Sequence, residues 1–252
     1  MIYILVLFGS LIGLCVLLGA RLIQRNRAVR KFVRGIKSRS DTAADRAGIT
    51  DETDIGRAKR PGRISAIELQ QVRTFVCKAE KEFARGNFDE VERCYIQALT
   101  IDPDAYEIQA EIAKLYLLTG REAKAEALYK EILNVCDDVS CYSNLGLSYY
   151  QQGKYSEACK AYGKALEKDP ANAERQFSLG RACIAAQRFK DAAPLLEKAS
   201  TRLSRNIELL YMLADCYMKL GFKEHAENAY RRINKIEPYN EEVKEKLIAL
   251  AN

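Results

Sequence analysis

A spacing of 33 to 34 residues recurs along most of the chain and constrains its fold more than any other feature. Five positions, Gly86, Gly120, Gly153, Gln187 and Gly221, follow one another at intervals of 34, 33, 34 and 34 residues. Small and bulky apolar residues fall at matching offsets around each of these positions. A period of this length is typical of solenoids, whose units bury their apolar faces only by stacking on one another. The sequence therefore predicts a repeat array.

Composition favours helices as the building blocks of this array. The 252 residues include 14 Gly and 5 Pro, which is below the roughly 12% that the two residues contribute to an average chain. An all-β protein with many tight turns needs more of both, as does a disordered or collagen-like chain. Each unit is thus expected to be two amphipathic helices joined by a short turn, with the Gly in the turn.

The third unit shows the repeat pattern most clearly. Its characteristic residues are Tyr142, Leu145, Gly146, Tyr149, Gly153, Tyr155, Ala158, Tyr162, Ala165 and Pro170. Small residues such as Gly146 and Ala158 are expected to let the two helices approach closely, with Tyr149 and Tyr162 filling the space around them. This pattern resembles the tetratricopeptide repeat (TPR), with Tyr142 where that family often has Trp.

The resemblance implies an all-α TPR α-solenoid of about five helix-turn-helix repeats within a domain spanning residues 64–252. The repeats are expected at 72–105, 106–138, 139–172, 173–206 and 207–240, followed by a capping helix at 241–251. The fourth repeat departs from the family pattern, because Gln187 replaces the turn Gly and Ser204 the usual Pro. Pro194 lies inside its second helix and is expected to bend that helix without breaking it.

One transmembrane helix is predicted before the array, and residues 1–23 form this anchor. Residues 2–20 are apolar and uncharged, and as a helix they would span about 28 Å, close to one hydrocarbon core. Basic residues follow this run and none precedes it, so the positive-inside rule puts the N-terminus outside and the TPR domain in the cytoplasm. A cleaved signal peptide is the alternative, but such peptides have a basic start and a shorter apolar core.

Residues 24–63 are predicted to be a basic juxtamembrane segment and a flexible linker. Residues 1–71 carry a net charge of +7, whereas residues 72–252 carry −1. The chain's overall charge of +6 therefore favours contact with anionic headgroups and not with nucleic acid. The residues expected at the membrane surface are Arg21, Arg25, Arg27, Arg30, Lys31 and Arg34. Ser65 and Glu68 have capping-box spacing, which predicts a helix start there.

The residues that carry most enzyme and metal chemistry are scarce. His225 is the single histidine, and the eight cysteines include no C-x-x-C pair. No phosphate-binding loop, nucleophile elbow or dinucleotide fingerprint occurs. We therefore expect no cofactor, no metal site and no catalytic activity. The cysteines are expected to be reduced thiols, mostly packed as small apolar residues in helices.

The resemblance also implies where a ligand would bind, because TPR arrays use the concave face formed by the first helix of each repeat. Carried over by position, the residues of this peptide-binding groove are Phe83, Lys114, Leu117, Asn144, Leu147, Tyr150, Phe177, Arg181, Ile184, Tyr211 and Met218. Asn144 matches one element of the carboxylate clamp that some members use for chaperone tails, but the accompanying basic positions are not matched. The aromatic and aliphatic lining suits a short helix or an extended apolar peptide.

These expectations combine into a membrane-anchored TPR adaptor or scaffold that binds partner proteins or peptides on the cytoplasmic side. Two other functions fit the same layout: an exported TPR protein that assists envelope or pilus assembly, and an organelle-type import receptor. The sequence leaves the partner, the pathway and the oligomeric state open.

Overall fold

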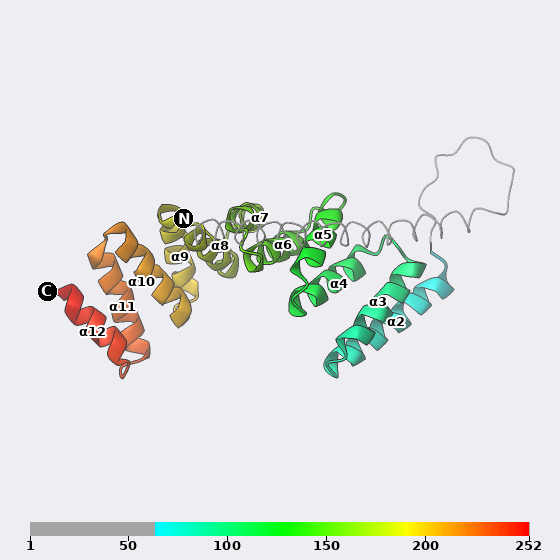
Figure 1. The fold of residues 1–252 in the computed structure, drawn as a ribbon, viewed down its shortest axis with the longest axis horizontal. Helices are drawn as coiled ribbons and strands as arrows, with labels where there is room; N and C mark the ends of the chain where they lie inside the picture. The colour runs from blue at the N-terminus through cyan, green and yellow to red at the C-terminus, as the bar shows by residue number, and fades with distance from the viewer. Residues whose placement is uncertain (1–63, 252) are drawn as a thin grey trace, which may run out of the picture. The chain divides into compact units, whose positions relative to one another are not determined.

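The computed structural model describes residues 64–251, which form eleven α-helices in that range. These residues belong to two compact units that divide between Ile132 and Leu133. The first unit contains α2 (Ala66–Ala84), α3 (Phe88–Ile101), α4 (Tyr106–Leu118) and α5 (Glu122–Leu133) (Figure 1). In this unit α3 packs against both α2 and α4. The packing of α2 on α3 is that expected of a helix-turn-helix repeat.

The second unit continues the alternation of first helices (α6, α8 and α10) with second helices (α7, α9 and α11). It contains α6 (Val139–Gln151), α7 (Tyr155–Lys168), α8 (Ala173–Ala185), α9 (Phe189–Arg202), α10 (Ile207–Leu220), α11 (Lys223–Ile236) and α12 (Glu241–Ala251) (Figure 1). Each helix from α7 to α12 packs against the helix before it. The all-α repeat architecture expected from the sequence is therefore confirmed within the described residues.

The turn within each pair lies at the position on which the repeats align. Gly86, Gly120, Gly153 and Gly221 have φ values between 67° and 79°, and Gln187 has φ 60°. Positive φ is the left-handed conformation that commonly ends a helix, and glycine adopts it without steric cost. Gln187 adopts the same left-handed conformation, so the fourth repeat keeps its turn. The conformation is strained at this position because Gln187, unlike glycine, has a Cβ.

Close helix approach explains the small residues of the pattern. A Cβ added at Gly146 in α6 would lie 2.8 Å from ring atoms of Tyr162 in α7. One added at Gly180 in α8 would lie 2.7 Å from Leu196 Cδ2 in α9. Both distances are well below van der Waals contact. Glycine thus lets the partner side chain pack directly on the first helix.

Local signals at the ends of the helices agree with the predictions made for them. Ser65 and Glu68 form the capping box, with Glu68 N–H donating to Ser65 Oγ at 3.2 Å and Ser65 N–H to Glu68 Oε2 at 2.8 Å. Pro194 lies within a continuous α9, as expected. The predicted capping helix is α12, which packs on α11 and buries Val243.

The fourth repeat ends without its usual Pro, and an arginine from the next repeat contacts its last turn. Arg232 in α11 donates to the carbonyl of Ser200 at 2.9 Å and to its Oγ at 3.0 Å. Ser200 is fully buried, so these bonds satisfy polar atoms that water cannot reach.

Three predicted features lie outside the described residues: the transmembrane anchor (1–23), the basic segment and linker (24–63), and the membrane-surface residues Arg21, Arg25, Arg27, Arg30, Lys31 and Arg34. Between residues 64 and 251, no helix combines the length and apolar character needed to cross a bilayer.

Candidate functional site

Three of the predicted groove residues lie in the first unit, where they differ in accessibility. Phe83 is 46% exposed and its ring packs edge-on against Phe88, with centroids 5.7 Å apart. Lys114 is exposed and forms an ion pair with Glu111 at 2.5 Å. Leu117 is buried. Of these three side chains, Phe83 and Lys114 are therefore accessible to a ligand, whereas Leu117 contributes to the core.

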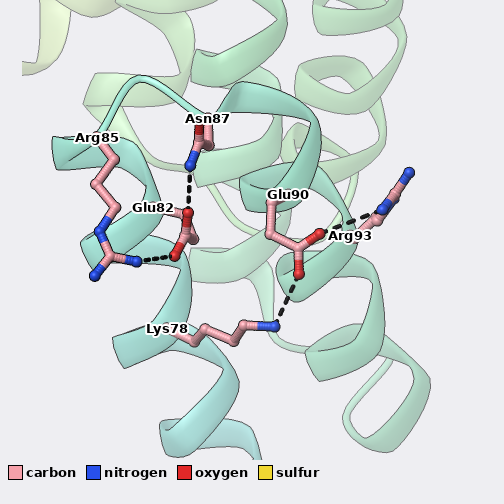
Figure 2. Close-up of polar contacts among 6 residues, drawn as sticks. All are labelled: Lys78, Glu82, Arg85, Asn87, Glu90 and Arg93. Atoms are coloured by element: carbon pink, nitrogen blue, oxygen red, sulfur yellow. Dashed lines mark hydrogen bonds and ion pairs between the residues drawn. The ribbon is translucent and has the colours of Figure 1, made fainter.

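Polar contacts that the sequence did not single out lie where α2 meets α3 (Figure 2), and the one between Lys78 and Glu90 joins the two helices. Glu90 accepts from Lys78 at 2.8 Å and from Arg93 at 3.4 Å. Glu82 accepts from Asn87 at 2.6 Å. Hydrogen bonds from these donors hold the pKa values of Glu82 and Glu90 below their usual range. Because these charged groups satisfy one another, we assign the cluster to the stability of the helix pair.

Arg181 is the centre of the candidate site in the second unit. Its guanidinium lies 4.9 Å from the ring centroid of Tyr150 in α6 and 5.8 Å from that of Phe177 in α8. Its Nη1 is also 3.9 Å from Glu208 Oε1 in α10. One side chain on α8 therefore contacts the first helices of the repeats on both sides, through a cation–π contact with Tyr150 and an ion pair with Glu208. A cation–π contact is typically worth about 0.5–2 kcal/mol.

The hydrogen bonding of Arg181 is incomplete. Its Nε is buried and has no acceptor among residues 64–251, although the side chain as a whole is 27% exposed. Burial raises the pKa of Tyr162 to about 12, and the nearby Arg181 guanidinium opposes part of that rise. A buried donor without a partner is costly, whereas the exposed part of the side chain presents a positive charge that an incoming acceptor can reach.

Tyr211 lies at the centre of a second aromatic and cationic cluster, formed by α10, α11 and α12. Its ring packs edge-on against Tyr230 with centroids 6.4 Å apart, and Lys246 Nζ lies 5.8 Å from the Tyr211 centroid. Asn240 donates to the Tyr211 hydroxyl at 3.0 Å and also accepts from the Val243 N–H at 3.2 Å. The loop that starts the capping helix therefore also fixes a residue of the candidate face.

The remaining predicted residues are distributed along the same first helices. Leu147 and Ile184 are partly buried against the core of the unit, and Asn144 has intermediate exposure. Met218 is 43% exposed. Phe177 is buried, but its ring still faces the Arg181 guanidinium. The structure thus brings Tyr150, Phe177 and Arg181 together, whereas Asn144 and Met218 are outside that cluster of contacts.

Sequence reasoning missed the residues that support this face from elsewhere in the unit. Tyr230, Asn240 and Lys246 contact Tyr211 but do not occupy the family's groove offsets. Glu208, which contacts Arg181, stands at a groove offset of the fifth repeat but is not among the predicted groove residues. Asn240 carries a usable signal, because it stands immediately before the acidic first turn of α12, where an N-cap residue is expected. The other three contacts depend on long side chains reaching across helices.

The described cysteines are free thiols, and most of them pack in the core. Five of the seven are buried, whereas Cys77 is exposed and Cys136 is half-buried. Burial raises the pKa of Cys183 to about 12 and that of Cys216 to about 11. Both thiols therefore stay protonated at neutral pH and are poor nucleophiles. Residues 64–251 contain no cluster of three His, Cys, Asp or Glu side chains placed to hold a metal ion.

Comparisons with known proteins match the repeat region. Two family models described as tetratricopeptide repeat match the chain. One matches residues 143–207, and the other matches residues 82–138 and 184–250. Together these ranges are well over half of the chain. Cilia- and flagella-associated protein 70 of Homo sapiens is 27% identical over 169 residues, which cover 64% of this chain but 15% of that protein.

Solved structures share the same fold. The crystal structure of MamA is 18% identical and superposes with a TM-score of 0.62, covering 69% of this chain and 95% of MamA. A tetratricopeptide repeat protein from Parabacteroides merdae ATCC 43184 is 16% identical, with a TM-score of 0.62 and 72% of each chain covered. These likenesses, at such identities, concern the fold alone.

Proposed function

The chain belongs to the tetratricopeptide repeat family, and we propose that it is a membrane-anchored adaptor that binds partner proteins or peptides through the first-helix face of its repeats. The observation that carries this proposal is the Arg181 cluster, in which one guanidinium contacts Tyr150, Phe177 and Glu208 from three consecutive first helices. Aromatic rings and an arginine are the side chains that contribute most to binding energy at protein interfaces.

The chemistry of this face indicates the kind of ligand. Tyr150, Ile184 and Tyr211 offer partly exposed apolar surface, while Arg181 offers a partly exposed cation. A short helix or an extended peptide with apolar side chains and one acceptor group fits this combination. The role that we propose is binding without a reaction of its own, and it uses neither a cofactor nor a metal.

Membrane anchoring and a cytoplasmic TPR domain are part of the same proposal. They are supported by the uncharged apolar run at residues 2–20 and by the eight Lys and Arg residues that follow it before Ser40. Such a distribution orients a single span with its basic flank inside. An adaptor held in this way would concentrate its partners at the membrane surface.

Site-specific crosslinking tests the binding role. A photoreactive residue at position 150 of the full chain, expressed in its native membrane, should capture a partner that mass spectrometry then identifies. Arg181→Gln should abolish that capture, whereas Lys160→Gln on the exposed side of α7 should leave it unchanged. Equal capture by wild-type and Arg181→Gln chains would contradict the proposal, provided that circular dichroism shows equal helix content.

Thiol labelling tests the proposed topology. Cys77 is exposed in α2, so a membrane-impermeant maleimide should label it only after cells are permeabilised. Labelling of Cys77 in intact cells would place the array on the outer side and favour the exported alternative.

A further inference from the structure

A groove of about 640 Å³ lies in the second unit, away from the first-helix face. It is formed by α9, the end of α10 and the turn that follows, and its lining residues are Lys190, Ala193, Pro194, Glu197, Lys198, Tyr217, Leu220 and Phe222. Its volume lies within the range of pockets that bind small ligands or a few side chains. None of the residues predicted for the first-helix face lines it.

The floor and one wall of the groove are apolar and aromatic. Phe222 remains 52% exposed, although its ring lies 6.4 Å from Tyr217 and 5.9 Å from His225. The His225 ring packs 5.0 Å from that of Tyr217 but does not line the groove, so Tyr217 and Phe222 are its aromatic lining. A large aromatic side chain left half in water beside Ala193 and Leu220 gains by being covered.

Pro194 removes one backbone hydrogen bond from α9 beside this apolar surface. Proline has no N–H, so it cannot bond to the carbonyl four residues earlier, which belongs to Lys190. Both residues line the groove. The Lys190 carbonyl therefore lacks its usual donor from four residues later in α9.

The charged residues that line the groove indicate which kind of segment it would bind. The one acidic lining residue is already engaged, because Glu197 accepts from the Tyr217 hydroxyl at 3.0 Å and lies 4.0 Å from Arg232. Lys190 and Lys198 have no carboxylate partner among residues 64–251. The open charges around the apolar floor are therefore positive.

We propose that this groove is a second docking site, which binds a partner segment carrying a large apolar side chain between acidic residues. The apolar side chain would cover Phe222 and Leu220, and the flanking carboxylates would pair with Lys190 and Lys198. The basic segment at residues 21–39 of this chain carries eight Lys and Arg and no acid, so like charges disfavour it as the occupant.

Binding of defined peptides to the full-length protein tests the site. The probe is a fluorescein-labelled Asp-Glu-Leu-Phe-Asp-Glu peptide, compared by fluorescence anisotropy with Lys-Arg-Leu-Phe-Lys-Arg, with Asp-Glu-Ser-Ser-Asp-Glu and with a peptide of residues 21–39. The acidic apolar probe should bind at least tenfold more tightly than each of the others, and its affinity should fall as salt is added. Equal or tighter binding of any comparison peptide would overturn the proposal.

Variants locate the binding. Lys190→Glu/Lys198→Glu should lower the affinity for the acidic probe at least tenfold. Phe222→Ser should have the same effect, and it tests the apolar contact independently of charge. The matched control is Lys160→Glu/Lys235→Glu, which makes the same charge change at exposed positions outside the groove and should keep the affinity within twofold.

A further comparison distinguishes this groove from the first-helix face. Arg181→Gln should leave the affinity for the acidic probe unchanged. A different pattern would show that the proposed second site is wrong: Arg181→Gln lowers the affinity for the acidic probe, whereas Lys190→Glu/Lys198→Glu and Phe222→Ser do not. The acidic segment would then bind the first-helix face. Sedimentation of the chain alone reports whether a second copy covers the groove: dissociation of a dimer by Phe222→Ser would also overturn the proposal.

Discussion

Replacing Gly146 with alanine isolates the energetic value of close helix approach. In a helix interior, Gly→Ala gains about 1 kcal/mol of helix propensity. At Gly163 in α7 an added Cβ meets nothing within 4 Å, so Gly163→Ala should raise the free energy of unfolding by about 0.5–1 kcal/mol. At Gly146 the same Cβ would lie 2.8 Å from the Tyr162 ring, about 1 Å inside normal carbon–carbon contact.

The overlap at Gly146 has no easy relief, because Tyr162 is buried. Overpacking of a core costs about 1–3 kcal/mol. Set against the gain in propensity, Gly146→Ala should leave the free energy of unfolding unchanged or lower it by up to about 2 kcal/mol. The difference between the two variants, about 1–3 kcal/mol, measures the clash itself, since the propensity gain is common to both.

Equilibrium urea unfolding followed by circular dichroism at 222 nm gives both free energies, and amide hydrogen exchange shows whether the loss is local to α6 and α7. Tyr162→Leu in the Gly146→Ala background should cost less than the sum of the two single changes, because a slimmer side chain makes room for the methyl group. Equal effects of Gly146→Ala and Gly163→Ala, or strict additivity with Tyr162→Leu, would refute the reasoning.

Three further outcomes follow from the same unit. Gln187→Gly should raise the free energy of unfolding by up to about 1 kcal/mol, because relief of the left-handed strain exceeds the added freedom of the unfolded chain; a lower urea midpoint would contradict this. Arg232→Ala should lower the free energy of unfolding by about 1–3 kcal/mol, because the buried Ser200 carbonyl loses its Arg232 donor while Ser200 Oγ keeps its bond to the Glu197 carbonyl; Arg231→Ala on the exposed side of α11 should change it little. Burial raises the pKa of Cys216 to about 11, so the folded state holds this proton more tightly than the unfolded chain does. The contribution of the protonated thiol to the free energy of unfolding is therefore complete below about pH 8.5 and is lost as pH rises toward 11. Urea midpoints between pH 7 and 10.5 should therefore fall less steeply in Cys216→Ala than in the wild-type chain.

The positions of the turns could be predicted because spacing and backbone chemistry point to the same residues. Four of the five aligned positions are glycine, and all five have positive φ. Gln187 was placed by spacing alone, since its side chain gives no turn signal. A periodic array makes such an inference possible, because each unit must present the same surfaces to its neighbours.

Accessibility on the first-helix face could not be predicted in the same way. Phe177 and Met218 both come from groove offsets, yet Phe177 is buried and Met218 is 43% exposed. The offset fixes the direction in which a side chain leaves its helix, whereas burial depends on what neighbouring helices place against it. At Arg181 these neighbours are Tyr150 and Glu208, and no local pattern pairs them.

Helix α10 shows how one helix can serve two separate surfaces. Successive residues turn by about 100° around the axis, so Tyr211 and Met218 lie within about 20° of each other on the first-helix face. Leu220, which lines the groove with α9, is turned about 180° from Tyr211 by the same geometry. Between the two surfaces lie Leu210, Leu213 and Ala214, all buried in the core. Because this packed core separates the two surfaces, we expect the two sites to bind independently, with no coupling free energy between them.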